Sequence, residues 1–486
     1  MAMGAQGNIL VKLSMFGWIP AVLLLFAKFK PRKAAAIAFC FAWMFLPVAS
    51  FPLKGLPDYT KMTASCMGIL AAAYLFDRRR LMGFRLKALD LPMLLWCTSP
   101  LLSSLSNGLG PYDGLSESMY QTVSWGMPYL VGRIYFADHD GLDTLTKTVF
   151  TGGLVYIPFC LVEIAISPQL HRLTYGYHQH SFLQTIRDGG FRPMVYMEHG
   201  LMTAMWMVTA AFLGVWLCAH GRLPKKMLAV PTVVLVAALV ATTCILRSTG
   251  AVFLLFLALA CLFAGKLFKT RIFLLILIVV PPIYITTRIN GWWTGEGLSR
   301  FIAANLSEER AQSLQFRLDN EVILIEKAAY GGFFGWGGWG RSRVFDENGK
   351  DISVTDGLWI ITLGTRGIYG LFWLNLAIVI PALMLLWRCP SKQLYSQSLA
   401  APLALAAIMA IYMIDNLPNA MVNPVFMLFN GALAGLVLSR QNLMAAADLV
   451  KSPFAHLRFL SQPGIAGNHL SQPVLPKLIG APRRTP

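Results

Sequence analysis

The chain has 486 residues, of which 56% are hydrophobic and 13% are charged. Soluble globular proteins carry about 25% charged residues, so this composition, with apolar runs long enough to span a bilayer, excludes a soluble globular enzyme. The 41 Lys and Arg residues outnumber the 23 Asp and Glu residues and give a formal net charge of +18. Because the basic residues lie mostly in short loops between apolar runs, the excess indicates membrane topology and not a nucleic-acid-binding surface. We therefore predict an all-α polytopic membrane protein.

A helix needs about 20 apolar residues to cross the hydrocarbon core of a bilayer. Turn and charge signals divide the sequence into thirteen candidate spans, or twelve if the first run does not cross. The eleventh span contains three glycines and is expected to be tilted or broken. The predicted spans cover residues 9–27, 34–53, 61–76, 90–105, 119–136, 146–167, 195–218, 228–246, 249–265, 272–288, 357–387, 398–415 and 421–439.

The positive-inside rule predicts which loops face the cytoplasm, because Lys and Arg in short loops are retained there during insertion. Counting through the thirteen spans places five basic loops on one side, together with the basic tail. The loop that contains Asp138, Asp140 and Asp143 also falls on this side, although it is acidic. The basic residues of the five loops are Lys28, Lys30, Arg32 and Lys33; Arg78, Arg79, Arg80, Arg85 and Lys87; Arg222, Lys225 and Lys226; Lys266, Lys269 and Arg271; and Arg388 and Lys392.

The opposite, external side carries two segments that are too long to be simple connections. Loops of such length are usually functional, and the periodicity of the longer one predicts two amphipathic helices, at 298–314 and 315–330. The basic tail combines Pro, Gly and Ser with positive charge, which predicts disorder. The predicted division is ten spans in 1–287 with a short external loop at 168–192, a large external loop at 288–356, C-terminal spans in 357–439 and a cytoplasmic tail at 440–486.

Arginines on the external side are not explained by insertion topology. A polyanionic partner such as a lipid-linked pyrophosphate would compensate them, since a guanidinium group offers phosphate a permanently charged, bidentate fork. Arg247 follows an apolar run and precedes Ser248-Thr249-Gly250, which predicts a tight turn at the membrane surface; its alternative role is a snorkelling anchor for the helix end. The external arginines are Arg172, Arg187, Arg192, Arg247, Arg288, Arg300, Arg310, Arg317, Arg341 and Arg343.

Arg192 opens the seventh span, and Glu198 and His199 are expected about two turns inside it. Ionisable side chains at that depth are costly and usually functional. We therefore assign both to the substrate site, with Glu198 facing an external arginine. The alternative for His199 is a hydrogen-bonded core residue. The spacing of His178 and His180 matches no zinc-binding pattern, so no metal site is expected.

The large loop adds further candidate substrate-binding residues, Arg317, Arg341, Trp336 and Trp339. Arg317 lies four residues before Glu321 on a predicted helix, where the two could instead form a solvated ion pair. Trp336 and Trp339 belong to a glycine-rich run and could stack on sugar rings, or they could form part of an interfacial aromatic belt.

Asp356 lies where the large loop re-enters the membrane. A carboxylate beside apolar surface binds its proton more tightly than one in water. It is therefore suited to act as a general base for an acceptor hydroxyl. The same position favours a helix N-cap, and the two roles are compatible.

With these motifs the sequence resembles the O-antigen ligase and polymerase superfamily of bacterial envelope glycan assembly. The resemblance extends over residues 191–371, and the order of the motifs on one predicted membrane face carries it. The motifs are Phe191-Arg-Pro-Met-Val-Tyr-Met-Glu-His199, Arg247-Ser-Thr-Gly-Ala, Phe316-Arg-Leu-Asp-Asn320, Tyr330-Gly-Gly-Phe-Phe-Gly-Trp-Gly-Gly-Trp-Gly and the segment from Asp356 to Gly370.

The resemblance implies glycan transfer from undecaprenyl pyrophosphate at the periplasmic face of the bacterial inner membrane, without a metal or other cofactor. By position it implies that Arg192 and Arg247 bind the pyrophosphate and that a base, here Asp356, lies near the end of the large loop. We hypothesise that the transfer inverts the anomeric centre and that Arg317 joins the two arginines on the departing pyrophosphate. The acceptor's proton goes to Asp356 or, as the alternative, to Glu198 or His199. The expected partners are the lipid-linked glycan donor, a glycan or lipid-linked acceptor, the lipid bilayer, a flippase and a chain-length regulator, and no nucleic acid.

One departure from the family pattern bears on the acceptor. Ligases typically carry a His-Asn pair eleven residues before Gly-x-x-Gly, and here that position holds Asp356-Gly357. This difference favours a polymerase of O-antigen or exopolysaccharide repeat units over an O-antigen ligase that transfers glycan to lipid A-core. The alternative from another class is a lipid-linked glycan flippase or transporter. Such proteins usually show internal repeats and ionisable residues near the middle of several spans.

Overall fold

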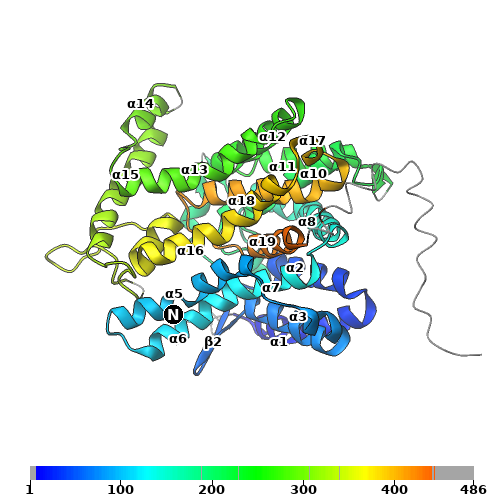
Figure 1. Ribbon diagram of the computed structural model, residues 1–486, viewed down its shortest axis with the longest axis horizontal. Helices are drawn as coiled ribbons and strands as arrows, with labels where there is room; N and C mark the ends of the chain where they lie inside the picture. The colour runs from blue at the N-terminus through cyan, green and yellow to red at the C-terminus, as the bar shows by residue number, and fades with distance from the viewer. Residues whose placement is uncertain are drawn as a thin grey trace, which may run out of the picture.

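The computed structural model describes residues 7–187, 189–227, 229–305, 307–338, 340–439 and 443. The described chain is a bundle of helices, with strands only in three two-stranded hairpins (Figure 1). Eight of its helices are long and apolar enough to cross a membrane. The chain is therefore an all-α polytopic membrane protein, as predicted. Of the predicted tail at 440–486, all but Leu443 lies outside the described residues.

In the described chain a helix covers each predicted span. The long apolar helices are α1 (Ile9–Lys28), α5 (Leu91–Ser106), α8 (His139–Ile166), α10 (Gly200–Ala219), α12 (Thr249–Leu267), α13 (Ile272–Ile289), α16 (Leu358–Arg388) and α18 (Ala400–Asp415). The shorter ones are α2 (Pro31–Phe45), α3 (Lys61–Phe76), α6 (Pro111–Gln121), the π-helical turn η3 (Thr122–Gly126), α7 (Met127–Tyr135), α11 (Thr232–Cys244) and α19 (Pro424–Leu438). The connections contain α4 (Arg78–Gly83), α9 (Leu170–Tyr175), α14 (Glu296–Asn305), α15 (Glu308–Ala329), α17 (Ser391–Leu394), the 3-10 turns η2 (Ala88–Asp90), η4 (Phe182–Thr185) and η5 (Gln397–Leu399), and the hairpins β1 (Ser50–Leu53) with β2 (Leu56–Thr60), β3 (Ile186–Arg187) with β4 (Gly190–Phe191), and β5 (Lys226–Met227) with β6 (Val230–Pro231).

Several predicted boundaries are wrong, among them the start of the sixth span, which begins at His139 and not at residue 146. The second span ends earlier than predicted, at Phe45, because Pro47 follows and the chain turns into β1. The seventh helix begins at Gly200 and not near residue 195. In the large loop, α15 runs through the predicted boundary at 314–315, because the start signal Ser307-Glu308-Glu309 lies earlier in the chain.

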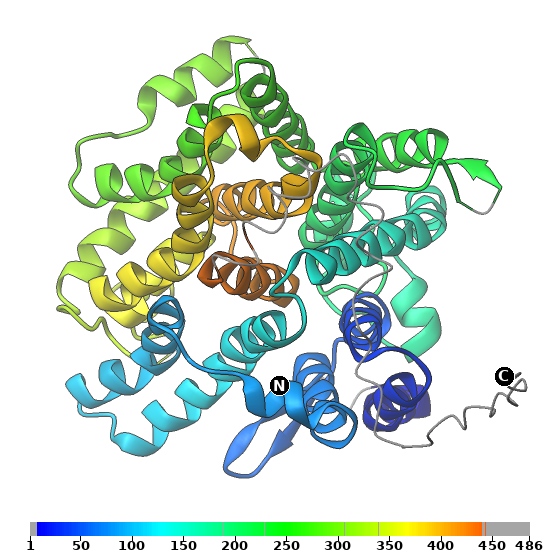
Figure 2. The same cartoon turned by 45° about the vertical axis from the view of Figure 1, so that its right-hand side comes forward.

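The centre of the bundle is formed by α18 and α19, which the other helices surround (Figure 2). Both are apolar on all sides, which is the pattern of a helix buried all round. Helix α19 packs closely on α7, where a Cβ atom at Gly132 or at Gly431 would collide with the carbonyl oxygen of Leu428 or Tyr129, respectively. Small residues of this kind let membrane helices approach at their backbones.

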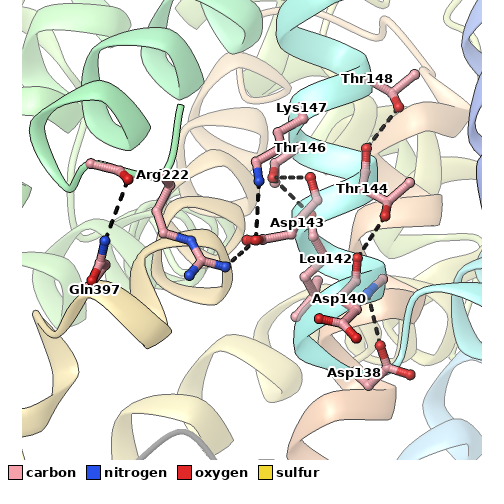
Figure 3. A network of polar contacts seen from close by, with 12 residues as sticks. Asp138, Asp140, Leu142, Asp143, Thr144, Thr146, Lys147, Thr148, Arg222 and Gln397 are labelled. Atoms are coloured by element: carbon pink, nitrogen blue, oxygen red, sulfur yellow. Dashed lines mark hydrogen bonds and ion pairs between the residues drawn. The ribbon is translucent and has the colours of Figure 1, made fainter. Parts of the chain in front are cut away.

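The acidic loop around Asp138 and Asp143, which is the exception to the positive-inside rule, forms ion pairs with nearby basic residues. Asp143 on α8 forms ion pairs with Arg222 and with Lys147, the latter at 3.4 Å between Oδ2 and Nζ (Figure 3). Asp138 forms an ion pair with Arg32. These acids therefore lie at the same end of the bundle as the basic residues, as the count of spans predicts.

Further contacts join the loops of this end. Arg271 donates a hydrogen bond to the carbonyl oxygen of Leu386, and Gln397 donates one to that of Gly221 at 3.4 Å. Helices α14 and α15 lie at the upper left of the view in Figure 1, away from α17. That the end with the basic loops faces the cytoplasm stays a prediction from the positive-inside rule.

Helix α16 is broken at Gly367, within the glycine triplet that predicted a break. Gly367 has φ 64° and ψ −167°, a conformation that is essentially restricted to glycine. The glycine-rich run packs against this break. The backbone N–H groups of Trp336 and Gly337 donate to the carbonyl oxygens of Gly364 and Thr365 at 2.9 and 3.1 Å. The run therefore satisfies carbonyl groups that the break removes from the helix ladder.

The close packing at Gly367 generates a stability prediction. In Gly367→Ala the new Cβ would collide with the carbonyl oxygen of Phe333 and would strain the backbone, which costs about 1–3 kcal/mol for the strain alone. We expect a lower melting temperature of the purified protein in detergent. Gly338→Ala is the matched control, since its nearest neighbour, Leu109 Cδ1, lies 3.9 Å away. Equal melting temperatures for the two variants would contradict this account.

Candidate functional site

Arg192 and Arg247, which the sequence assigned to one site, are adjacent in the structure. The Nε and Nη2 groups of Arg192 donate to the carbonyl oxygen of Arg247 at 3.1 and 3.0 Å. Arg247 Nη1 donates to the carbonyl oxygen of Arg187 at 3.3 Å. The guanidinium of Arg247 lies against Gly190, where any Cβ atom would collide with it. Three arginines thus gather where the β3–β4 hairpin meets the turn between α11 and α12, and we call Arg187, Arg192 and Arg247 the arginine cluster.

The backbone of Arg247 has φ 53°, in the left-handed region. Few residues other than glycine adopt this conformation, and those that do are often at functional sites. The tight turn predicted from Ser248-Thr249-Gly250 is therefore present, and it holds the carbonyl group of Arg247 toward Arg192. The Arg247 side chain is half-buried between elements and does not extend freely into an interface.

A buried carboxylate fixes the segment between Arg192 and α10. Glu163, on α8, accepts hydrogen bonds from the backbone N–H groups of Leu170, Met194 and Val195 at 3.0, 2.8 and 2.7 Å. Charge-assisted hydrogen bonds of this kind are about twice as strong as neutral ones. Sequence reasoning missed Glu163, although a single carboxylate inside an apolar span was a signal for it.

Glu198 and His199 precede α10, so their predicted depth of two turns inside the helix is wrong. His199 is the N-cap residue: its Nδ1 accepts from the N–H of Leu201 at 3.1 Å, and its Nε2 lies 3.1 Å from Oε1 of Gln184. These partners require the tautomer that carries its proton on Nε2. Burial lowers the pKa of His199 to about 4, and the neighbouring His180 and the charges of Arg192 and Arg187 act in the same direction. His199 is therefore neutral near pH 7.

Glu198 lines a cavity of about 510 Å³, which is within the range of about 300–1,000 Å³ for small-ligand sites. The Glu198 side chain is exposed, and in the described chain it makes no hydrogen bond or ion pair. The cavity lies beside the arginine cluster, because the aliphatic part of the Arg192 side chain packs against Gly200, two residues after Glu198.

Arg317 and Asp356, two further predicted site residues, form an ion pair with 3.5 Å between Nε and Oδ2. The alternative considered for Arg317, an ion pair with Glu321, is not what the structure shows. Glu321 instead binds Arg288 Nε at 2.8 Å and the Tyr284 hydroxyl at 2.9 Å, because both groups lie on the face of α13 that packs against α15. The N-cap of α16 is the residue after Asp356, so the expected N-cap role of Asp356 is also wrong.

Helix α15 links the Arg317–Asp356 pair to the arginine cluster. Arg310 Nη2 donates to Oγ1 of Thr249 at 3.4 Å, two residues after Arg247. Arg317 follows Arg310 by two helical turns, or about 10 Å along the axis. All these predicted residues therefore lie at one end of the bundle, but Asp356 is not in direct contact with the arginine cluster.

The aromatic and basic residues of the glycine-rich run are placed differently from the expectation. Lys327 Nζ lies 4.2 Å from the ring centroid of Trp336, and the Trp336 Nε1–H donates to the carbonyl oxygen of Lys327 at 2.8 Å. One face of the Trp336 ring is thus covered by this chain. Arg341 is exposed. Trp339, the other predicted sugar-stacking residue, lies outside the described residues.

No protein-family model matches the chain, and no curated protein is significantly similar to it. Among the described residues no group of three or more His, Cys, Asp or Glu side chains could hold a metal ion. The candidate site therefore consists of the arginine cluster, the cavity and the Arg317–Asp356 pair.

The lowered pKa of His199 predicts a pH dependence of stability. The folded-state pKa of about 4 lies below the ordinary value of 6.5, so the unfolded chain binds more protons between these values and stability falls as the pH falls through this window. His199→Asn keeps an N-cap side chain without the titration. We expect the melting temperature of the variant, relative to the wild type, to rise as the pH is lowered from 6.5 to 4. A constant difference across this range would refute the buried neutral state of His199.

Proposed function

We propose that the protein is a glycosyltransferase of the polymerase type, which joins undecaprenyl-pyrophosphate-linked glycan repeat units at the periplasmic face of the bacterial inner membrane. The observation that carries this proposal is the packing of Arg192 against Arg247 beside a polar cavity. The product is an O-antigen or exopolysaccharide chain, and the transfer inverts the anomeric centre.

The arginine cluster supports the binding of a diphosphate. Each guanidinium group carries a permanent positive charge and can donate two parallel hydrogen bonds to phosphate oxygens. Two of these arginines also act on His199. Its pKa is lowered mainly by burial and further by the positive charges of Arg192 and Arg187. Hydrogen bonds fix both guanidinium groups to the backbone, so little ordering is needed when a diphosphate binds.

The proposed reaction forms one bond and breaks one. The acceptor hydroxyl oxygen attacks the anomeric carbon of the donor glycan, and the bond from that carbon to the pyrophosphate oxygen breaks with its electron pair on the pyrophosphate. Arg192 and Arg247 stabilise the negative charge that develops there, and one such contact contributes about 3 kcal/mol to the lowering of the barrier. Two carboxylates at this end of the bundle are candidates to accept the hydroxyl proton, Asp356 and Glu198.

Two alternatives differ in what they do with the same donor. An O-antigen ligase would transfer the glycan to lipid A-core, and Asp356-Gly357 in place of a His-Asn pair favours the polymerase over this enzyme. A flippase would move the lipid-linked glycan without making a glycosidic bond. The chemical product therefore separates all three: a longer lipid-linked chain, a glycan on lipid A-core, or no new bond.

The arginine cluster predicts a large loss of activity on substitution. We expect Arg247→Ala and Arg192→Ala each to lower the rate of glycan elongation by about 100-fold or more, because one contact to the developing charge is lost. Arg247→Lys keeps the charge but loses the bidentate fork, so its loss should be smaller. The measurement is elongation of undecaprenyl-pyrophosphate-linked oligosaccharide by the purified full chain in liposomes.

Arg79→Ala is the matched control, since Arg79 is an exposed arginine on α4 at the opposite end. Its elongation rate should equal that of the wild type. Melting temperatures of all variants distinguish lost chemistry from lost folding, which matters most for Arg192, because its side chain also binds the Arg247 carbonyl. Normal elongation by folded Arg247→Ala protein would overturn the proposed role of the cluster.

A further inference from the structure

The cavity beside the arginine cluster is built mainly by the N-terminal half of the chain, outside the segment that resembles a known family. Its walls come from α2, the β1–β2 hairpin, the start of α3, the α6–η3 junction, the segment before α10 and the segment before α19. Its polar lining residues are Ser50, Asp58, Thr60, Lys61, Thr63, Tyr120, Ser124, His180, Glu198 and His199. A site with donors, acceptors and both signs of charge suits a ligand that carries many hydroxyl groups.

Lys61 is the most unusual residue of this lining. It is 7% exposed and is the first residue of α3, where the helix dipole disfavours a cation. Its Nζ lies 3.5 Å from the carbonyl oxygen of Trp43, 3.4 Å from that of Tyr196 and 4.6 Å from the centroid of the Trp43 ring. Burying an ammonium group at the positive end of a helix dipole lowers the stability of the folded protein. A residue kept there at such a cost points to a role in binding.

Two carboxylates share the cavity with Lys61. Asp58 accepts a hydrogen bond from the Ser50 hydroxyl, and this leaves further acceptor positions on its oxygens. Glu198 makes no hydrogen bond or ion pair in the described chain and is exposed toward the cavity. Sugar hydroxyl groups donate to carboxylates and accept from an ammonium group, so this set matches a saccharide.

The backbone of the cavity wall is also irregular at the site. Between α6 and α7 the helix passes through the π-helical turn η3, and Val123 and Ser124 of this turn line the cavity. Single π-helical turns inside helices frequently occur at functional sites, because they displace side chains that a regular helix would place elsewhere.

We propose that this cavity binds the acceptor sugar and that the carboxylate of Glu198 accepts the proton of the attacking hydroxyl. This inference rests on the proposed glycosyltransferase function and assigns its acceptor site. Glu198 lies in the cavity, and Gly200, two residues further, packs against Arg192. Asp356 is not among the residues that line the cavity, and its carboxylate faces the guanidinium of Arg317 at 3.5 Å.

The step is balanced within the two substrates and the chain. The O–H bond of the acceptor breaks, its proton goes to Glu198, and its oxygen forms the new bond to the anomeric carbon. The carbon–oxygen bond to the pyrophosphate breaks, and undecaprenyl pyrophosphate leaves with the electron pair, held by Arg192 and Arg247. Glu198 then releases the proton to water, and Lys61 and Asp58 hold the other hydroxyl groups of the acceptor.

The test uses the full chain in liposomes, with undecaprenyl-pyrophosphate oligosaccharide from the source membranes as donor and the oligosaccharide released from it by mild acid as acceptor. Glu198→Gln should lower kcat about 100-fold or more, because a general base contributes about 10²–10⁴-fold, with little change in the KM for acceptor. Asp58→Asn and Lys61→Met should raise the KM for acceptor about tenfold, since each removes a hydrogen bond to a charged group, while the KM for donor stays unchanged. Asp356→Asn, which removes the ion pair with Arg317, should lower kcat much less than Glu198→Gln does.

Glu326→Gln, at an exposed position on α15, is the matched control for the isosteric change of Glu198. If the wild type transfers glycan and Glu198→Gln matches Glu326→Gln, the acceptor site is refuted and the proposed function stands. If Asp356→Asn, and not Glu198→Gln, abolishes kcat, the base is Asp356 and the inference is wrong.

If the wild type makes no glycosidic bond at all, the proposed function fails and the acceptor site fails with it. Melting temperatures exclude unfolded variants. Glu198→Gln, which loses no hydrogen bond or ion pair of the described chain, keeps the test decisive if Lys61→Met does not fold.

Discussion

The double hydrogen bond from the Arg192 guanidinium to the Arg247 carbonyl oxygen is the contact on which the rest of the site depends. It joins the segment before α10 to the turn between α11 and α12, and it requires the left-handed backbone at Arg247. The buried carboxylate of Glu163 fixes the other side of the same segment through three backbone N–H groups. Irregular backbone at a helix end is tolerated in a membrane protein only where such partners satisfy its polar groups.

The same requirement explains the break in α16. The helix ladder is interrupted at Gly367, and the glycine-rich run supplies the N–H groups that its free carbonyl groups need. Only glycine permits this approach, because a Cβ at Gly335 would collide with the backbone of the break. The run that looked like a sugar-stacking segment therefore has a structural role, and Trp336 is tied to Lys327 within it.

The two halves of the chain contribute differently to the site. Residues 187–247 supply the arginine cluster, and Arg317 and Asp356 add their ion pair. The N-terminal spans supply most of the cavity wall, including the buried Lys61. In the proposed enzyme the arginine cluster acts on the pyrophosphate, which every lipid-linked donor shares, and the cavity contacts the acceptor, which differs between polysaccharides.

The sequence by itself determined the fold class and the positions of the helices, because a span of apolar residues must form a helix in a bilayer whatever its neighbours are. Its glycine triplet predicted the break in α16, and its resemblance to a family of glycan transferases, not a local pattern, implied that Arg192 and Arg247 act together. Only the tertiary structure decided that Arg317 pairs with Asp356 and not with Glu321, that Glu198 lines a cavity, and that Lys61 and Asp58 share it. Those contacts join residues far apart in the chain, and their partners are set by how α13, α15 and the first helices pack, which no local pattern encodes.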